Sequence, residues 1–272
     1  MALVLQTKEV IGTGAKLYRD ALVSNGTLMM LDFSNRGTLH GFSLKRGFPI
    51  RDLSDFPDVN NGTRVVNSSD LNISEGLGFP LHELDTGEGS SINLGKDLLN
   101  YLHENENNEF LFVFWLRRDE NVSGSTSTFI NSSDDSNYMI RSRISIAGSN
   151  RVITTTVGDA PVGLRITDEF NNGDIVQAAV HYRGVGEDVI SFKNSQQHDT
   201  STRPSAGFGV PESDLLIGRI ESGVPFNMYR IFMEDLTASG RNAEDVIQED
   251  WEYNNAIGKY SYMEKRSFID TL

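Results

Sequence analysis

Short segments that are either apolar throughout or alternate between apolar and polar residues dominate this chain. The strongest is Phe110–Leu116 (FLFVFWL), which is apolar on both faces and therefore predicts a central strand covered on both sides. Tyr138–Ile146 alternates more strictly, because Ile140 shares one face with other apolar residues while Arg141 and Arg143 project from the opposite face. A short continuous apolar run and an alternation with a period of two are both consistent with β-strands.

The C-terminal part continues the same pattern and ends in a helix. Ile175–Tyr182 and Val189–Phe192 flank the turn GVGE and predict a hairpin, which a long polar loop follows at Asn194–Pro211. Further strands are predicted at Leu215–Ile220 and Met228–Met233. Asn242 is a suitable N-cap, and the acidic residues after it favour a helix through Gln248 or beyond.

Shorter segments predict the remaining elements. Leu98, Leu99 and Leu102 suggest a single helical turn. Additional strands are predicted at Thr27–Phe33, Gly37–Leu44, Thr63–Val66, Leu77–Leu81, Arg151–Val157 and Val162–Ile166, and an edge strand at KYSYME near the C-terminus. Many short strands without a βαβ rhythm predict an all-β fold, a two-sheet antiparallel jelly-roll sandwich with a short C-terminal helix. We expect residues 27–254 to form this domain, with an N-terminal arm or edge strand at 1–26 and a C-terminal extension at 255–272.

The order of these segments resembles the concanavalin A-like lectin/glucanase superfamily, and within it the laminin-G-like jelly rolls. The resemblance rests on an aromatic-Trp pair at Phe114-Trp115, on Ala178–Gly184 with its hairpin partner Val189–Lys193, on the "iG" strand Leu216–Gly218, and on Tyr229–Trp251. The phrase MEDLTASGRNAEDV also resembles the ending of such modules in phage and prophage virion proteins. The resemblance implies a protein that holds or binds something rather than one that transforms it.

Composition and charge argue against several classes of function. The chain has 272 residues, 24 Lys and Arg against 38 Asp and Glu, a net charge of −14 and no cysteine. The acidic excess disfavours a nucleic-acid-binding surface, and the lack of cysteine excludes disulfides, thiolate metal sites and cysteine nucleophiles. No apolar run is long enough to span a membrane, and the N-terminal residues MALVLQTKEV are not expected to act as a secretory signal.

Three residues are candidates for contacts with a glycan or a partner protein. Arg141 and Arg143 project from one face of the same strand and suit an anionic glycan or a partner carboxylate. A solvated sheet face with paired charges is the alternative for both arginines. Trp115 lies on the second apolar face of the central strand, where it would either stack on a sugar or pack beneath a covering loop or subunit.

Acidic segments raise two further hypotheses. Glu83, Asp85 and Glu88 have the E-x-D-x-x-E spacing of laminarinase-type glycosidases, but Gly87 interrupts the strand that this chemistry needs, which favours an acidic surface turn and no catalytic residue. The oxygen-rich loops 134–137 and 168–174 suit Ca²⁺, although ordinary solvated turns have the same composition. The sequence therefore leaves the metal question open.

Together these patterns predict a non-enzymatic structural or adhesion component of a phage virion, located on the tail, fibre or capsid surface. Its expected partners are other virion structural proteins, further copies of itself as a homo-oligomer, and a cell-surface glycan. A stand-alone glycan-binding module and a laminarinase-type glycoside hydrolase are the alternatives.

Overall fold

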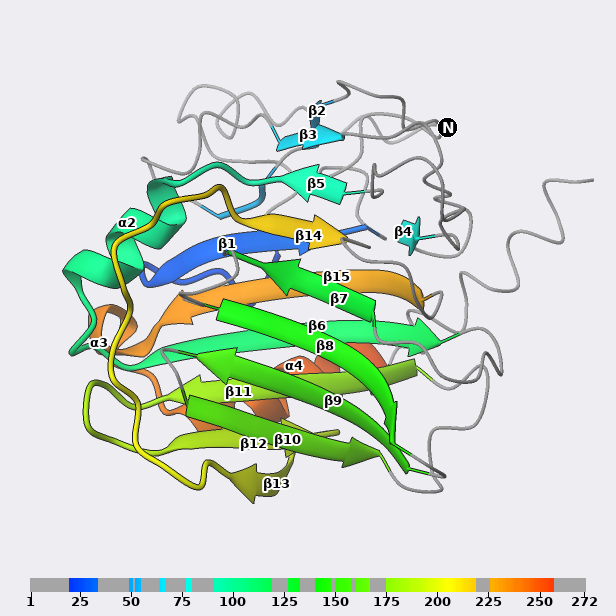
Figure 1. The fold of residues 1–272 in the computed structure, drawn as a ribbon. Coiled ribbons are helices and arrows are strands. Elements are labelled where there is room, and N and C mark those ends of the chain that lie inside the picture. Colours follow the sequence, from blue (N-terminus) through cyan, green and yellow to red (C-terminus); the bar gives the residue numbers. More distant parts are fainter. Residues whose placement is uncertain are drawn as a thin grey trace, which may run out of the picture.

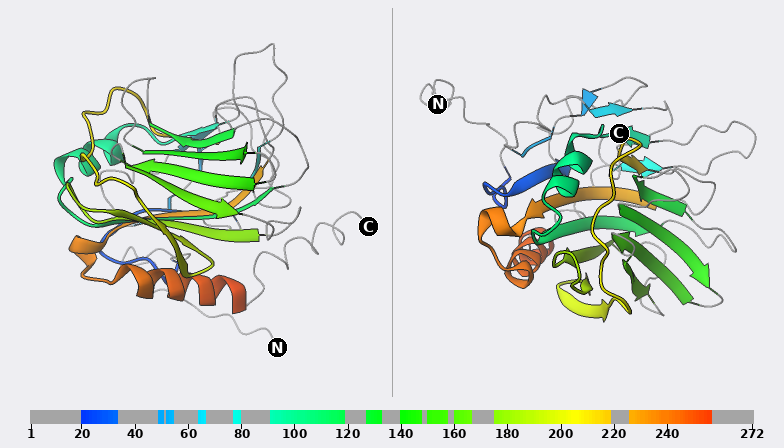
Figure 2. Two further views of the ribbon diagram at one scale, coloured as in Figure 1. Left: turned by 60° about the horizontal axis from the view of Figure 1, so that its bottom comes forward. Right: turned by 60° about the vertical axis from the view of Figure 1, so that its left-hand side comes forward.

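The computed structural model describes residues 20–33, 49–50, 52–54, 64–66, 77–79, 91–118, 127–132, 140–147, 150–157, 160–166, 175–218 and 226–256. Within these ranges the chain forms two antiparallel sheets that face each other, with one layer of additional structure on one side (Figures 1 and 2). The sequence-based prediction of an all-β sandwich with a short C-terminal helix is confirmed.

The first sheet has seven strands among the described residues, in the order β1-β15-β6-β11-β12-β13, with β4 also paired to β15. Their bounds are β1 Thr27–Asp32, β4 Leu77–Phe79, β6 Phe110–Arg118, β11 Ile175–Tyr182, β12 Val189–Lys193, β13 Gln196–Thr200 and β15 Phe226–Asp235. Strand β6 pairs with β15 on one side and β11 on the other, which makes it the central strand that its apolar sequence predicts.

The second sheet has eight strands in the described part of the chain, in the order β10-β9-β8-β7-β14-β5-β3-β2. Their bounds are β2 Pro49–Ile50, β3 Arg64–Val66, β5 Ser91–Asn93, β7 Ser127–Asn131, β8 Ile140–Ala147, β9 Asn150–Val157, β10 Ala160–Ile166 and β14 Leu216–Gly218. This sheet lies in front of the first one in Figure 1.

Three helices are described: α2 Asp97–Glu104, α3 Leu236–Ser239 and α4 Ala243–Ala256. The predicted cap of α4 is confirmed, because Asn242 Oδ1 accepts hydrogen bonds from the backbone nitrogens of Glu244 at 2.8 Å and Asp245 at 3.3 Å. Helix α4 lies against the outer face of the first sheet, on the side opposite to β7, β8 and β9 (Figure 2, left). In the described part of the chain, no helix has both the length and the apolar character needed to cross a bilayer.

Two apolar cores result, one on each face of β6. Phe110, Phe112, Phe114 and Leu116 point between the two sheets, and all four are at most 1% exposed. Leu111 and Val113 point the other way, into a second core beneath α4 that also contains Ile247. Because both faces of β6 are buried, its continuous apolar sequence follows from its position.

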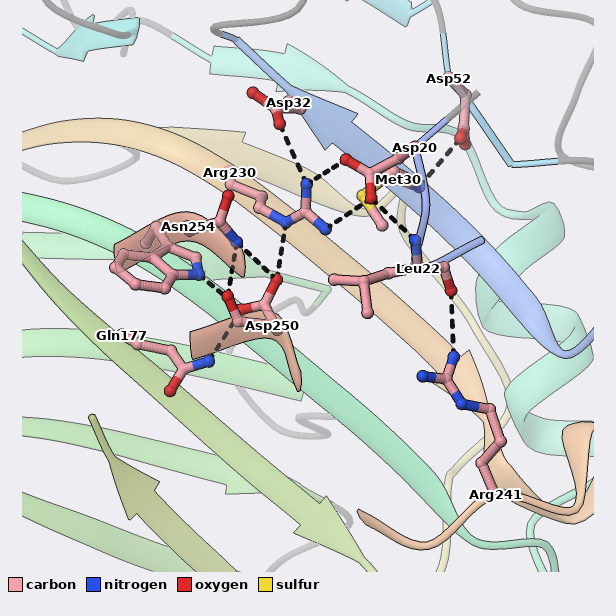
Figure 3. A network of polar contacts seen from close by, with 11 residues as sticks. Asp20, Leu22, Met30, Asp32, Asp52, Gln177, Arg230, Arg241, Asp250 and Asn254 are labelled. Atoms are coloured by element: carbon pink, nitrogen blue, oxygen red, sulfur yellow. Dashed lines mark hydrogen bonds and ion pairs between the residues drawn. The ribbon is translucent and has the colours of Figure 1, made fainter. Parts of the chain in front are cut away.

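A buried ionic network ties the covering layer to the first sheet (Figure 3). Arg230 of β15 is fully buried; its Nη1 lies 2.6 Å from Asp20 and 3.0 Å from Asp32, and its Nε lies 3.0 Å from Asp250 of α4. Residues from the two ends of the described chain therefore meet at one guanidinium. Burying charges is tolerated in a fold when they are paired in this way.

Beside this network, Glu234 is a second buried acidic group on the same strand. Its Oε1 accepts a hydrogen bond from Ser24 Oγ at 3.0 Å and its Oε2 lies 3.3 Å from Arg241 Nη1. Burial raises the pKa of the Glu234 carboxyl above its usual value, and this effect exceeds the opposing effects of the hydrogen bond from Ser239 and of the charge on Arg241. The folded state therefore favours the protonated acid.

We expect Glu234→Gln to alter the pH dependence of stability in a defined direction. A raised folded-state pKa means that the contribution of Glu234 is fully present below its unfolded value of 4.5 and is lost as the pH rises through the folded value. The free energy of unfolding of the Gln variant minus that of wild type should therefore increase as the pH rises from 4.5 through the folded-state pKa. The total increase should be about 1.4 kcal/mol for each unit by which the folded-state pKa exceeds the unfolded value. Denaturant titrations across this pH range measure it, with Glu187→Gln as an exposed control. A flat difference curve would contradict the assignment.

The structure departs from the sequence-based elements in several places. It contains β5 and β7, for which no strand was predicted, and β13 lies inside the predicted loop Asn194–Pro211. β13 is polar and mostly exposed, because it lies at the edge of its sheet. It was not predicted because it lacks an apolar face that a sequence pattern could indicate. The predicted helical turn is the eight-residue α2. The predicted strand 37–44 and the KYSYME segment lie outside the described residues.

Candidate binding surface

The two outer faces of the sandwich differ in what covers them. The outer face of the seven-stranded sheet lies beneath α4 and segment 20–23, and its side chains form the second core and the Arg230 network. Among the described elements, no helix lies over β7, β8 and β9 on the eight-stranded sheet (Figures 1 and 2). The eight-stranded sheet is therefore the better candidate for contacts with another molecule.

Strand register divides the eight-stranded sheet into an inner and an outer row. The inner row is at most 1% exposed and consists of Ile92, Ile217, Ile130, Ser142 and Thr155, paired in that order. The next row, here called the outer row, consists of Asn93, Leu216, Asn131, Arg141 and Thr156, paired in that order across β5, β14, β7, β8 and β9. Alternation along each strand places the outer row on the opposite face of the sheet.

The outer row is mainly polar and only partly covered. Asn93, Leu216, Asn131 and Thr156 are half-buried, and Arg141 is 7% exposed. Asn93 donates to Asp214 Oδ2 at 2.8 Å and accepts from the Gly95 nitrogen at 2.7 Å, and Asn131 and Arg141 also have partners within the protein. Amides, hydroxyls and a guanidinium can donate and accept hydrogen bonds at one surface. This combination is suited to a ligand that has many hydroxyl or carboxyl oxygens.

Arg143 lies two residues from Arg141 on the same face of β8, as the alternating pattern predicts. Its side chain is half-buried, and its Nε is shielded from solvent without a hydrogen-bond partner. The residues directly opposite it are Thr128 on β7 and Thr154 on β9, so neither neighbouring strand places a carboxylate across from this guanidinium. Arg143 is thus a half-buried cation without a carboxylate opposite it in the strand register.

Trp115 occupies a different environment. It is 3% exposed, its ring is stacked on that of Trp251 with centroids 5.5 Å apart, and its Nε1 donates a 2.6 Å hydrogen bond to Asp250 Oδ2. It faces α4, on the opposite side of the sandwich from Arg141 and Arg143, so the structure does not bring the three predicted residues together. The indole matches the second interpretation of the sequence, a core residue beneath a covering element.

The other candidates lie outside the described residues: Glu83, Asp85 and Glu88 as well as both oxygen-rich loops, 134–137 and 168–174. In the ranges that the structure describes, no group of three or more acidic or histidine side chains is arranged to hold a metal ion. The glycosidase and calcium hypotheses therefore remain predictions.

Sequence reasoning missed most of the outer row. Asn93, Asn131 and Leu216 lie on three-residue or five-residue strands, too short for alternation to define a face. Thr156 belongs to a predicted strand, but the run of three threonines there is polar on both faces and hides which one is buried. Only cross-strand register identifies these residues as one row.

No protein-family model matches the chain, and no curated protein matches its sequence. Solved structures do match. The binding domain of botulinum neurotoxin DC in complex with rat synaptotagmin II has a TM-score of 0.52 at 12% identity, over 84% of this chain and 51% of that one. A botulinum neurotoxin type C structure also matches, from work on the dependence of cell entry on two ganglioside molecules. Its TM-score is 0.51 at 14% identity, over 86% of this chain and 52% of that one.

A Trypanosoma rangeli sialidase in complex with a difluoro sugar acid matches with a TM-score of 0.55 at 10% identity, over 86% of this chain and 33% of the sialidase. The chain thus spans about half of the neurotoxin domains and a third of the sialidase. At these identities the similarity concerns the fold. Two antiparallel sheets, the strand order and these structural matches show that the chain has a concanavalin A-like fold.

Proposed function

We propose that this protein is a non-enzymatic adhesion module that binds a glycan through the outer row of its eight-stranded sheet. The observation that carries the proposal is the contrast between the two outer faces of the sandwich. One is covered by α4 and held by buried ions, whereas the other presents half-buried Asn, Thr and Arg side chains. A polar surface on a rigid sheet is pre-organised to bind, because little conformational entropy is lost on association.

The residue chemistry supports a glycan as the ligand. Asn131 and Thr156 flank Arg141 in the register, and Arg143 lies one step further along the same strand face. Sugar hydroxyls both donate and accept hydrogen bonds, which suits amide and hydroxyl side chains at neighbouring positions. The structural matches are compatible with binding, since one neurotoxin structure concerns an interaction with gangliosides and another contains synaptotagmin II, and each finding belongs to that protein alone.

A glycan array with matched variants tests the proposal. Thr156→Ala and Asn131→Ala should each weaken binding by about fivefold to tenfold, the effect of one lost hydrogen bond. The controls Thr202→Ala and Asn255→Ala make the same chemical changes at exposed positions outside the outer row and should leave binding unchanged. Binding that is insensitive to both outer-row variants would contradict the assignment of this face.

The non-enzymatic character needs its own measurement. Any glycan that binds is incubated with the protein, and the release of reducing ends is followed. We expect none. Hydrolysis that disappears in Glu83→Gln would instead establish a glycosidase, because that carboxyl is one of the pair that such chemistry requires.

We further propose that the module is a homo-oligomeric component of a phage virion that contacts other virion structural proteins. The support is the sequence around α3 and the start of α4, MEDLTASGRNAEDV, which resembles the ending of such modules in virion proteins. Light scattering of the purified chain and its detection in purified particles are the tests. A monomer that is absent from particles would leave a stand-alone glycan-binding module.

A further inference from the structure

Arg143 has a hydrogen-bond donor that the described fold does not use. Its Nε is shielded from solvent and has no partner, although most buried polar groups in proteins are hydrogen-bonded. The group has lost hydration without gaining an internal hydrogen bond, which is unfavourable for a guanidinium. The half-buried side chain must turn before this Nε can reach an acceptor from outside the protein, and such an acceptor would then supply the missing hydrogen bond.

The positions around Arg143 are neutral in the strand register. Thr128 and Thr154 lie directly across from it, and the neighbouring pair positions of Arg141 are Asn131 and Thr156. Arg141 lies two residues away on the same strand, which corresponds to about 7 Å of extended chain. Arg141 and Arg143 therefore place two positive charges on the same face of β8.

An oxyanion is the acceptor best matched to this arrangement. A guanidinium binds a carboxylate through short charge-assisted hydrogen bonds that are about twice as strong as neutral ones, and its planar fork can engage both oxygens. The chain as a whole has a net charge of −14, so an anion is not attracted by the overall charge of the protein. Recognition of an anion here must be local.

We infer that Arg143 selects an acidic saccharide, one whose sugar carries a carboxylate, as the ligand of the outer row. This inference rests on the proposed function, because it names the class of glycan that the same face binds. Arg143 forms the charged contact, and the neutral amides and hydroxyls of the outer row contact the sugar hydroxyls. Arg141, which already has partners within the protein, adds positive charge beside the contact without being assigned a direct bond.

A matched pair of ligands tests this selection. The affinity of wild-type protein for a uronic-acid oligosaccharide is compared by calorimetry with its affinity for the carboxyl-reduced form of the same oligosaccharide, in which a neutral hydroxymethyl group replaces each carboxylate. We expect wild type to bind the acidic form at least about tenfold more tightly, with an advantage that shrinks at high salt. Sulfated and sialylated oligosaccharides, assayed in parallel, distinguish other sources of negative charge.

Variants then locate the source of the preference. Arg143→Ala should bring the two affinities to within about twofold of each other while retaining binding of the neutral form, and Arg143→Lys should keep part of the preference because it retains charge but lacks the Nε donor. Arg203→Ala removes an exposed arginine from the loop after β13, outside the outer row, and should change neither affinity. Thermal unfolding of each variant excludes misfolding, and Arg143→Lys serves as the test if Arg143→Ala is unstable.

The outcomes separate the two proposals. Equal binding of the acidic and neutral ligands by wild type, or a preference that survives in Arg143→Ala, overturns the selection by Arg143 and leaves glycan binding intact. A strong preference for sulfated sugars alone also overturns the assignment to a carboxylate. If no neutral, uronic, sialylated or sulfated glycan binds at all, the proposed function itself fails together with the inference.

Discussion

Replacing Arg230 with methionine is expected to destabilise the protein by about 3–5 kcal/mol, the cost of removing one partner from a buried ion pair. The substitution keeps an unbranched side chain of similar length but leaves Asp20, Asp32 and Asp250 without the guanidinium that they share. Because these carboxylates are at most 5% exposed, water cannot replace the lost charge without opening the structure. Urea unfolding followed by tryptophan fluorescence measures the effect, since Trp115 donates a hydrogen bond to Asp250 and stacks on Trp251.

Arg183→Met is the matched control, because Arg183 is exposed and its replacement should change stability by less than about 0.5 kcal/mol. The triple variant Asp20→Asn, Asp32→Asn, Arg230→Met adds a sharper comparison. It removes much of the uncompensated charge and should recover part of the lost stability, because an unpaired buried charge costs more than an absent pair. A loss of under 1 kcal/mol in Arg230→Met would show that α4 and segment 20–23 stay in place without these ions.

Substitutions at Trp115 are expected to lower stability and leave binding unchanged. Trp115→Ala opens a cavity beneath α4 and should cost about 3–5 kcal/mol, whereas Trp115→Phe keeps a ring against Trp251 but removes the donor to Asp250 and should cost about 1–3 kcal/mol. Denaturant unfolding gives these values, and the glycan affinity of the folded Trp115→Phe variant gives the second readout.

The residue with which Trp115 stacks supplies the comparison. Trp251 is only half-buried and lies on α4, so Trp251→Phe should cost less than Trp115→Ala. Normal stability combined with a loss of glycan binding in Trp115→Phe would contradict this expectation and assign Trp115 to the binding surface.

Long apolar or strictly alternating segments could be assigned from the sequence. β11 was predicted with its correct ends, and β6 and β8 with small errors at theirs, because each strand is long enough to show its pattern. The three-residue strands β5 and β14 give a much weaker signal, and the polar edge strand β13 gives none. The strand character of β5 and β14 comes from partners that lie far away in the chain, whereas β13 pairs with the neighbouring β12.

The candidate site shows the same limit. Alternation along β8 correctly placed Arg141 and Arg143 on one face, but it could not say which residues stand beside them. It also could not separate those arginines from Trp115, because the sequence of a strand does not say which sheet it enters. The Arg230 network was not predicted, since its members come from both ends of the described chain and follow no local spacing.

The order of strands in the seven-stranded sheet has a consequence for how the protein is made. β15 lies between β1 and β6, so two strands from the first half of the chain are joined by one that is synthesised near the end. At roughly 5–20 residues per second, β6 emerges from the ribosome on the order of ten seconds before β15 does. During that interval FLFVFWL has no complete sheet to enter, so we expect productive folding to await the synthesis of β15 and to benefit from chaperones that shield apolar strands.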